Sequence, residues 1–198
     1  MVEPLSIAVY AVRKAGVNVG DTVAVVGQGP IGLFVDQVAK SAGGTVFGFD
    51  RHDGRLQYAQ NHQYVYKGIN TNGEKFIERL RETDGYNGAD VTFEAVGSES
   101  SAELALELTR AGGKVVILGV FEHDVHINMM QIVKKELQVQ GSWTCIFSFD
   151  QTLLLLKTKK IDITGLITHR YPFSDAMKAF DEATNDKANR IKSVIEFE

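Results

Sequence analysis

One short segment, GQGPIG at residues 27–32, constrains the fold of this chain more than any other. It directly follows the apolar run Thr22–Val26, which is too compact for a helix and is typical of a buried parallel strand. A helical pattern begins at Ile31 and extends to about residue 42. Strand, glycine-rich turn and helix in this order predict a βαβ unit that binds a dinucleotide at the helix N-terminus.

Each residue of the segment has a physical reason to be there. Gly27 permits a tight turn, and Gly29 lets backbone N–H groups approach a pyrophosphate with no side chain in between. Pro30 costs nothing in a first helical turn, where its missing N–H has no partner to lose. Gly32 lets helix and strand pack closely. The predicted cofactor-binding residues of the turn are Gly27, Gly29, Pro30, Ile31 and Gly32.

Asp50 ends the next apolar run, residues 45–49, within the same unit. Its carboxylate can accept hydrogen bonds from both hydroxyls of an adenosine ribose and would repel a 2′-phosphate, so it favours NAD over NADP. Arg51 and Arg55 follow and are also candidate cofactor contacts, either to a 2′-phosphate or as ordinary solvated side chains. A glycine turn that binds phosphate without nicotinamide, as in methyltransferases, is the alternative for the whole segment.

Helical and strand patterns alternate along the rest of the chain. This alternation predicts an α/β fold of the Rossmann type, a doubly wound six-stranded parallel sheet in the order 3-2-1-4-5-6. The ligand crevice is expected at the carboxyl ends of the first and fourth strands. Further strands are predicted at residues 64–66, 89–95, 113–118 and 137–141, and helices at residues 4–15, 53–61 (with Asp53 as cap), 74–82, 98–110, 128–135 and 149–158.

The last segment breaks this alternation. Residues 167–171 and 193–197 are predicted strands, and Ser174 can cap a helix over residues 175–184. A strand-helix-strand tail after a complete six-strand set indicates a piece of a second domain. The predicted organisation is therefore a junction helix at 1–16, a dinucleotide-binding domain at 17–160 and a separate segment at 161–198.

Composition narrows the setting. The 198 residues carry a net charge of -4 without a basic stripe, and no run approaches the length of a membrane span, which argues against nucleic-acid or membrane partners. The lone Cys145 leaves no disulfide framework and favours a reducing, cytoplasmic location. The apolar stretch at residues 153–156 is expected to be buried, in part against a partner subunit.

Several further stretches resemble one family. They are EPLS at 3–6, GDTV at 20–23, FDR at 49–51, DVTFEAVG at 90–97, GGKVVILG at 112–119 and LITHRYP at 166–172. Together with the glycine turn they resemble the C-terminal part of zinc-dependent medium-chain alcohol and polyol dehydrogenases, the group that holds sorbitol and threonine dehydrogenases. The resemblance implies an NAD-binding Rossmann domain followed by a remnant of the GroES-like catalytic domain.

The resemblance also implies contacts at the nicotinamide end of the cofactor, at the turns that follow the fourth, fifth and sixth strands. Each of these groups ends a parallel strand on the ligand side, although each could instead serve packing alone. The implied residues are Val96 and Gly97, then Leu118, Gly119 and Val120, and finally Ser142, Trp143 and Thr144.

In this family a zinc ion activates the alcohol, and its ligands belong to a domain that precedes Glu3. The resemblance therefore implies hydride transfer between a secondary alcohol and a ketone, with no catalytic or metal residue in this chain and little activity alone. Glu3 matches a glutamate that reaches zinc-bound water, or it is a solvated helix-start acid. Thr144 and Cys145 replace an Arg-Tyr pair of polyol dehydrogenases, so sorbitol is not predicted as substrate.

Three readings remain open at this point. The first is a truncated enzyme portion that binds NAD(H) and forms a homo-oligomer through the edge strand at residues 137–141. The second is a stand-alone NAD-binding module without catalysis. The third is metal-free catalysis, as in relatives of quinone reductase, and the Glu3-Pro4 junction argues mildly against it.

Overall fold

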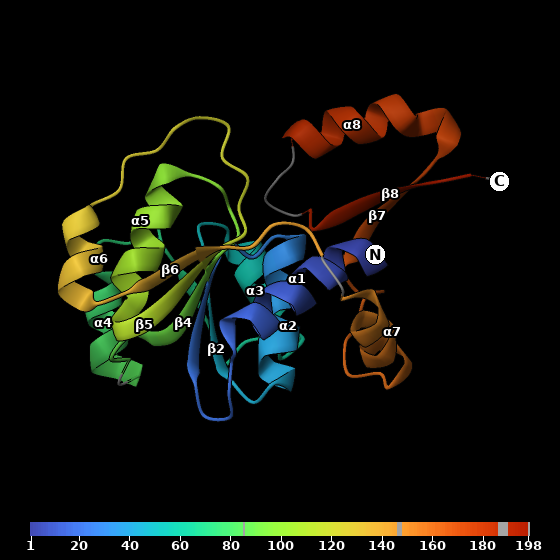
Figure 1. Ribbon diagram of the computed structural model, residues 1–198. Helices are drawn as coiled ribbons and strands as arrows, with labels where there is room; N and C mark the ends of the chain where they lie inside the picture. The colour runs from blue at the N-terminus through green and yellow to red at the C-terminus, as the bar shows by residue number, and fades with distance from the viewer. Residues whose placement is uncertain (85, 146–147, 186–189, 198) are drawn as a thin grey trace.

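The computed structural model describes residues 1–84, 86–145, 148–185 and 190–197. Its centre is a six-stranded sheet in the order β3-β2-β1-β4-β5-β6, with all neighbours parallel, which confirms the predicted fold class and strand order (Figure 1). The strands are β1 Thr22–Val26, β2 Thr45–Asp50, β3 Lys67–Asn70, β4 Ala89–Glu94, β5 Thr109–Ile117 and β6 Gln138–Gly141.

The strand register aligns the carboxyl ends of the central strands. Val26, at the end of β1, pairs with Phe49 in β2 and with Glu94 in β4. Ile117, at the end of β5, pairs with Glu94 and with Gly141. Because parallel strands all point the same way, the residues that follow them meet at one edge of the sheet. The predicted crevice residues are thereby brought to a common edge.

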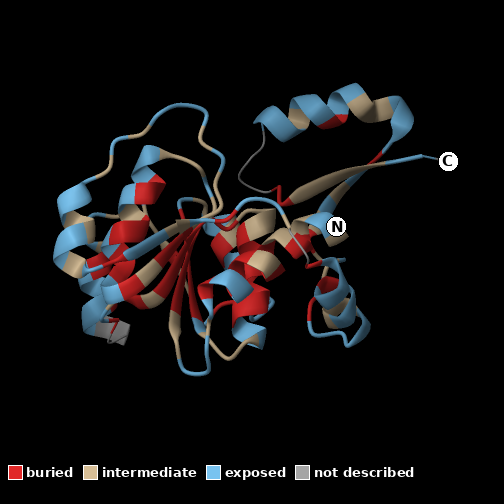
Figure 2. Cartoon of the chain, in the orientation of Figure 1, coloured by how far each residue is buried: buried red, intermediate tan, exposed pale blue. Residues whose placement is uncertain are grey.

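Helices cover both faces of the sheet, and two apolar cores result. One core joins the sheet to α1, α2 and α3, and the other joins it to α4 and α5. Figure 2 shows the buried residues gathered in the strands and on the inner sides of these helices. The helices are α1 Val2–Ala15, α2 Pro30–Ser41, α3 Asp53–Asn61, α4 Phe76–Asp84, α5 Glu99–Leu108, α6 Met129–Lys135 and α7 Phe149–Lys157.

A second, smaller unit follows the main sheet. Strands β7 Ile167–Pro172 and β8 Lys192–Glu196 form a separate parallel pair, and between them lie the 3-10 turn η1 Phe173–Asp175 and helix α8 Ala176–Asn185. We call these residues, 167–197, the C-terminal unit. It stands to one side of the main sheet, beside the end that carries the N-terminus (Figure 1).

The segment before the C-terminal unit is fixed to two helices of the main domain. The side-chain amide of Gln37 in α2 accepts from the N–H of Asp162 at 2.8 Å and donates to its carbonyl at 3.1 Å. The Tyr64 hydroxyl donates to the Asp162 carboxylate at 3.1 Å, and the Tyr58 hydroxyl of α3 donates to the Gly165 carbonyl at 2.5 Å. Burial and the nearby Asp162 charge raise the pKa of the Tyr64 hydroxyl. We call these contacts the 162–165 clamp.

Three local predictions were wrong. The third strand lies at Lys67–Asn70 rather than at residues 64–66, because Tyr64 and Val65 pack into the core instead of joining the sheet. Helix α3 has His52, not Asp53, at its N-cap position. Ser174 caps no helix, since it lies inside the 3-10 turn η1 and its hydroxyl donates to the neighbouring Asp175 carboxylate at 3.3 Å.

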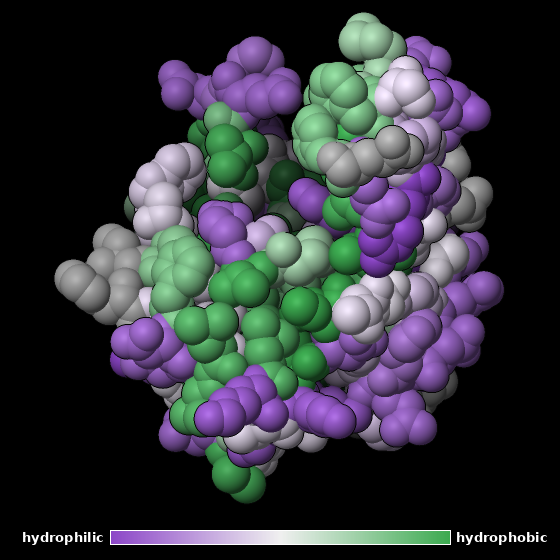
Figure 3. All heavy atoms as spheres, turned by 90° about the vertical axis from the view of Figure 1, so that its right-hand side faces the viewer, coloured by the Kyte–Doolittle hydropathy of each residue, from purple (hydrophilic) through white to green (hydrophobic). Residues whose placement is uncertain are grey.

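The leucine run of α7 also differs from expectation. Leu153 and Leu154 are 53% and 60% exposed in this chain, although burial was predicted. Helix α7 lies on the right-hand side of Figure 1, and this side, which faces the viewer in Figure 3, carries a patch of hydrophobic side chains. The run is apolar nearly all round, but only one side of the helix packs against the chain, mainly against α1. Among the described residues, no helix is both long and apolar enough to cross a membrane.

Candidate functional site

The glycine turn between β1 and α2 has no room for a side chain at Gly32 but has open space at Gly29. A Cβ on Gly32 would lie 1.8 Å from the Gly27 carbonyl oxygen, so any side chain there would displace the turn. Gly27 has φ +97°, a left-handed conformation that favours glycine, and its N–H donates to the Phe49 carbonyl at 2.7 Å. A Cβ on Gly29 would meet only the Arg55 guanidinium, at 3.9 Å.

Gly29 and Pro30 occupy the N-cap and the first position of α2. The first N–H groups of a helix lack intrahelical partners, and the helix dipole adds partial positive charge there. The open space over Gly29 therefore lies where an anion would be stabilised. This combination fits the pyrophosphate of a dinucleotide.

Asp50, the last residue of β2, is held firmly at this turn. Its Oδ2 accepts the backbone N–H of Gln28 at 2.8 Å, and its Oδ1 accepts the backbone N–H of His52 at 2.9 Å. The His52 ring nitrogen Nδ1 lies 3.0 Å from the same Oδ1. Arg55 approaches Oδ2 at 3.9 Å. His52 was not singled out as a site residue from the sequence, although its position two residues after the acid was a usable signal.

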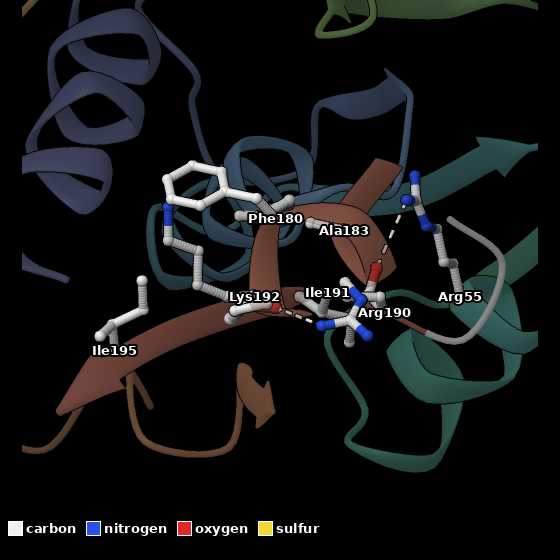
Figure 4. A pocket seen from close by; sticks show the side chains of 10 residues that line it. Arg55, Phe180, Ala183, Arg190, Ile191, Lys192 and Ile195 are labelled. Atoms are coloured by element: carbon white, nitrogen blue, oxygen red, sulfur yellow. Dashed lines mark hydrogen bonds between the residues drawn. The ribbon is translucent and has the colours of Figure 1, made fainter. Parts of the chain in front are cut away.

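A cavity of about 460 Å³ opens between the turn and the C-terminal unit. Pro30 and Arg55 line it on one side, and Phe180, Arg190 and Lys192 on the other (Figure 4). The Arg55 guanidinium reaches across and donates to the Arg190 carbonyl at 3.4 Å. Three cationic side chains thus surround a space that begins at the N-terminus of α2. Sequence reasoning placed no site residue on the C-terminal unit and missed Arg190 and Lys192.

Arg190 is a buried residue whose position is fixed by polar contacts. Its guanidinium donates to the Tyr171 hydroxyl at 2.9 Å, to Ser193 Oγ at 2.6 Å and to the Glu182 carboxylate at 3.1 Å. Hydrogen bonds from the Tyr171 hydroxyl and then from Arg190 lower the pKa of the Glu182 carboxyl. This network joins β7, α8 and β8 into one unit.

The turns after β4 and β5 touch each other. A Cβ on Gly97 would lie 2.4 Å from the Val120 carbonyl oxygen, and one on Gly119 would lie 2.2 Å from the Gly97 nitrogen. Gly97 also has φ +87°. The fully buried Glu94 supports this contact, because its Oε1 accepts the N–H groups of Val96 at 2.8 Å and Gly97 at 2.9 Å.

Glu94 was quoted in the sequence motif but was not singled out. Its second oxygen, Oε2, is buried without a hydrogen-bond partner among the described residues, and a Cβ on Gly119 would lie 2.4 Å from it. An acid as the last residue of the strand, directly before the turn, was the available signal. It joins the two turns expected at the nicotinamide end.

The remaining predicted residues occupy the same edge with different exposure. Val96, Val120 and Trp143 are exposed, Trp143 by 69%, whereas Ser142 is buried and its N–H donates to the Ile117 carbonyl at 2.8 Å. Leu118 packs partly against the core, and Thr144 adopts φ 60°. Arg51 is exposed, and its carbonyl accepts from Asn70 and Asn72. All of these residues lie in segments that directly follow the parallel strands β2, β4, β5 and β6.

A zinc site does not fit the donors present. The residues that the structure describes hold no group of three or more His, Cys, Asp or Glu side chains that could bind a metal ion. Glu3 is exposed near the start of α1, and Cys145 is half-buried.

Comparison with known families agrees with this geometry. A model described as zinc-binding dehydrogenase matches residues 30–158, more than half of the chain. The chain belongs to the zinc-binding dehydrogenase family. It is similar to a sorbitol dehydrogenase of Halalkalibacterium halodurans, 36% identical over 196 residues that make up 96% of this chain and 57% of that protein. The chain therefore spans little more than half the length of this curated relative.

Solved structures extend the likeness to the fold of the chain. A short chain alcohol dehydrogenase of Escherichia coli CFT073 in complex with NADH matches at a TM-score of 0.90 and 27% identity, over 100% of this chain and 58% of that one. A putative zinc-binding dehydrogenase of Sinorhizobium meliloti 1021 bound to NADP matches at a TM-score of 0.88 and 29% identity. The match covers 98% of this chain and 57% of that one. The two neighbours thus carry different nicotinamide cofactors.

Proposed function

We propose that this chain is the NAD(H)-binding part of an oxidoreductase that moves hydride between a secondary alcohol or polyol and a ketone. The observation that carries the proposal is the open space over Gly29 at the N-terminus of α2, directly beside the fixed carboxylate of Asp50. Family membership and the NADH-bound neighbour support it.

In this proposal the pyrophosphate binds at Gly29 and Pro30, against the free N–H groups of α2. The cavity beside them is lined by Arg55, Arg190 and Lys192, whose positive charge favours the same anion. The C-terminal unit would therefore contribute to the pyrophosphate site from the side opposite the glycine turn.

Asp50 is proposed to bind the hydroxyls of the adenosine ribose. A carboxylate offers about four lone-pair positions, so the N–H groups of Gln28 and His52 leave acceptor capacity for the ribose. Its negative charge opposes a 2′-phosphate, which favours NAD(H). Arg51 and Arg55 stay candidate contacts at this end, and Arg55 is placed between Asp50 and the cavity.

The turns after β4, β5 and β6 are proposed to hold the nicotinamide end. When bound, the nicotinamide ring supplies the hydride acceptor or donor. The protein's part is to orient that ring: backbone atoms of Gly97 and Gly119 form the floor, and Val96, Val120 and Trp143 exclude water. Leu118, Ser142 and Thr144 complete this edge.

We further propose that residues 161–198 belong to the catalytic domain and that the alcohol-activating groups lie outside this chain, which then binds cofactor with little or no turnover. Residues 1–16 would be the junction helix and 17–160 the cofactor domain. A cytoplasmic homo-oligomer through the edge strand β6 is part of the same proposal, since Val139 on that strand is exposed. A stand-alone NAD-binding module is the alternative.

The test is a fluorescence titration with NADH and, separately, NADPH, exciting Trp143 and following energy transfer to the reduced nicotinamide. We expect saturable transfer with NADH at least about tenfold tighter than with NADPH, a difference of about 1.4 kcal/mol. Asp50→Asn, which keeps the shape but removes the charge, should narrow that preference. No transfer to a demonstrably folded protein would overturn the proposal, and turnover of an alcohol by this chain alone would contradict the proposed inactivity.

A further inference from the structure

A buried acid lies behind the glycine turn and has no part in the contacts described so far. Asp36 is on the inner side of α2 and is fully buried, and so is Gln28, the residue between the two turn glycines. The Gln28 side-chain amide donates to Asp36 Oδ1 at 3.4 Å and to the Val25 carbonyl at 3.4 Å. Two polar side chains therefore meet inside an otherwise apolar core.

Two atoms of this pair have no partner among the described residues: Oε1 of Gln28 and Oδ2 of Asp36. Both are acceptors when Asp36 is ionised, so neither can satisfy the other. A proton on Asp36 removes a buried charge and supplies the missing donor. Burial raises the pKa of the Asp36 carboxyl well above its ordinary value, partly offset by the Gln28 hydrogen bond.

The elements packed around Asp36 offer little compensating charge. The buried residues of α1 are apolar apart from Ser6, and β1 contains no titratable residue. β2 contributes only Asp50, an acid whose oxygens already accept the Gln28 and His52 N–H groups. Next to Asp36 on α2, Gln37 binds the backbone of Asp162, a third acid. Burial is therefore the main cause that favours the neutral form of Asp36.

Gln28 links this pair to the dinucleotide turn. Its backbone N–H donates to Asp50 Oδ2 at 2.8 Å, while its side chain lies over Gly48, where an added Cβ would be 2.8 Å from Gln28 Cδ. The side chain is therefore confined between Asp36 and the backbone of β2. Any shift of this side chain moves the peptide that leads into Gly29 and the N–H that holds Asp50.

We propose that Asp36, as an uncharged acid paired with Gln28, is a positioning residue for the dinucleotide turn. It touches no cofactor atom and acts through Gln28 on the backbone of Gly29 and on the carboxylate of Asp50. This proposal rests on the proposed function, because its consequence is the affinity for NADH. Ionisation of Asp36 removes the proton that its carboxyl group could donate and places a charge beside the buried Gln28 side chain, so the support of the turn is weakened.

The experiment compares the wild type with Asp36→Asn, which is neutral at every pH, and Asp36→Leu, which cannot hydrogen-bond. NADH titrations are run from pH 6 to pH 9. The wild type should lose affinity as the pH rises, whereas Asp36→Asn should keep a flat profile. Asp36→Leu should bind NADH about tenfold more weakly than Asp36→Asn at every pH, which is the effect expected from the loss of one buried hydrogen bond. The control is Thr92→Val, which removes a buried hydroxyl in β4 that bonds to Thr109 at 2.7 Å, away from the turn.

Two measurements without cofactor complete the test. An acid that is protonated in the folded state and ionised in the unfolded chain costs stability as the pH rises above its ordinary range, so Asp36→Asn should gain stability over the wild type with rising pH. Hydrogen exchange at residues 27–30 should increase in Asp36→Leu but not in Thr92→Val.

The outcomes separate the two proposals. If the wild type binds NADH and its pH profile matches that of Asp36→Asn, the positioning role is overturned while the proposed function stands. If Asp36→Leu leaves both NADH affinity and exchange at residues 27–30 unchanged, the role is overturned as well. If the folded wild type binds no NADH at any pH, the proposed function fails and the role of Asp36 toward the cofactor fails with it.

Discussion

The main domain and the C-terminal unit are built from similar elements but differ in how they are held. In the main domain Phe34, Phe49 and Phe93 are fully buried, and most of the central strands are inaccessible to solvent. In α8 only Ala179 is buried, while Met177 is 80% and Phe180 66% exposed. The C-terminal unit is held mostly by polar contacts, the Arg190 network within it and the 162–165 clamp before it, while its Ile191 joins the apolar core of the main domain. We therefore expect the main domain to contribute most of the free energy of unfolding, and the C-terminal unit to tolerate substitutions better.

The largest effect is expected when one phenylalanine in each region is replaced by alanine. Phe93→Ala should reduce the free energy of unfolding by about 3–5 kcal/mol, because it leaves a cavity in the centre of the sheet. Phe180→Ala removes an exposed ring and should change it by less than about 0.5 kcal/mol. Urea denaturation measures both. Equal losses would show that α8 is packed as tightly as the sheet.

The next test lies at the glycine turn. Gly32→Ala brings a Cβ within 1.8 Å of a backbone oxygen, so it should cost about 1–3 kcal/mol of stability and abolish NADH binding. Gly29→Ala meets only the end of Arg55 and should fold normally while weakening NADH binding, because its methyl enters the proposed phosphate space. Thermal unfolding and NADH titration read the two effects separately. A stable Gly32→Ala protein that binds NADH would contradict the packing described for the turn.

A smaller effect is expected where α6 meets α5. The Lys135 ammonium donates to the carbonyls of Leu106, Glu107 and Thr109 at 2.8–2.9 Å and so satisfies the C-terminal end of α5. Lys135→Met keeps the apolar stem and should cost about 1 kcal/mol, since the group is partly exposed. The neighbouring exposed Lys134→Met is the matched control. If the denaturation curves of Lys135→Met and Lys134→Met coincide, this role of Lys135 is contradicted.

The smallest effect is a change with pH confined to the C-terminal unit. Because the folded-state pKa of Glu182 is lowered, first by the Tyr171 hydroxyl and then by Arg190, its contribution is present above the ordinary glutamate range of about pH 4.3. The contribution is lost as the pH falls through the lower folded value. Hydrogen exchange in residues 167–185 should therefore increase on acidification before that of β1 or β4. In Glu182→Gln this difference should disappear.

The same contrast explains what the sequence could predict. The strand order and the glycine turn followed from apolar runs and from glycines at fixed positions, and β1 was predicted with the bounds observed. These elements are buried, so their patterns are dictated by the core. The third strand was misplaced because Lys67–Asn70 is an edge strand with a single buried residue, Ile69, whereas Tyr64 and Val65 have higher strand propensity.

Contacts between distant segments were beyond sequence reasoning. The 162–165 clamp and the cavity between Arg55 and Lys192 each depend on how finished elements meet. The exposure of Leu153 depends on what packs against α7, which its own apolar pattern does not encode. A local pattern specifies an element, but a site is specified by the arrangement of several.

The 162–165 clamp also has a mechanical consequence. Asp162 is bonded to Gln37 of α2, and Gly165 to Tyr58 of α3. One of these helices begins at the glycine turn, and the other begins three residues after Asp50. A pulling force applied to the C-terminal unit is therefore delivered to the two helices that frame the proposed cofactor site. Tension on the C-terminal end of the chain would therefore displace these two helices before it separates the strands of the central sheet.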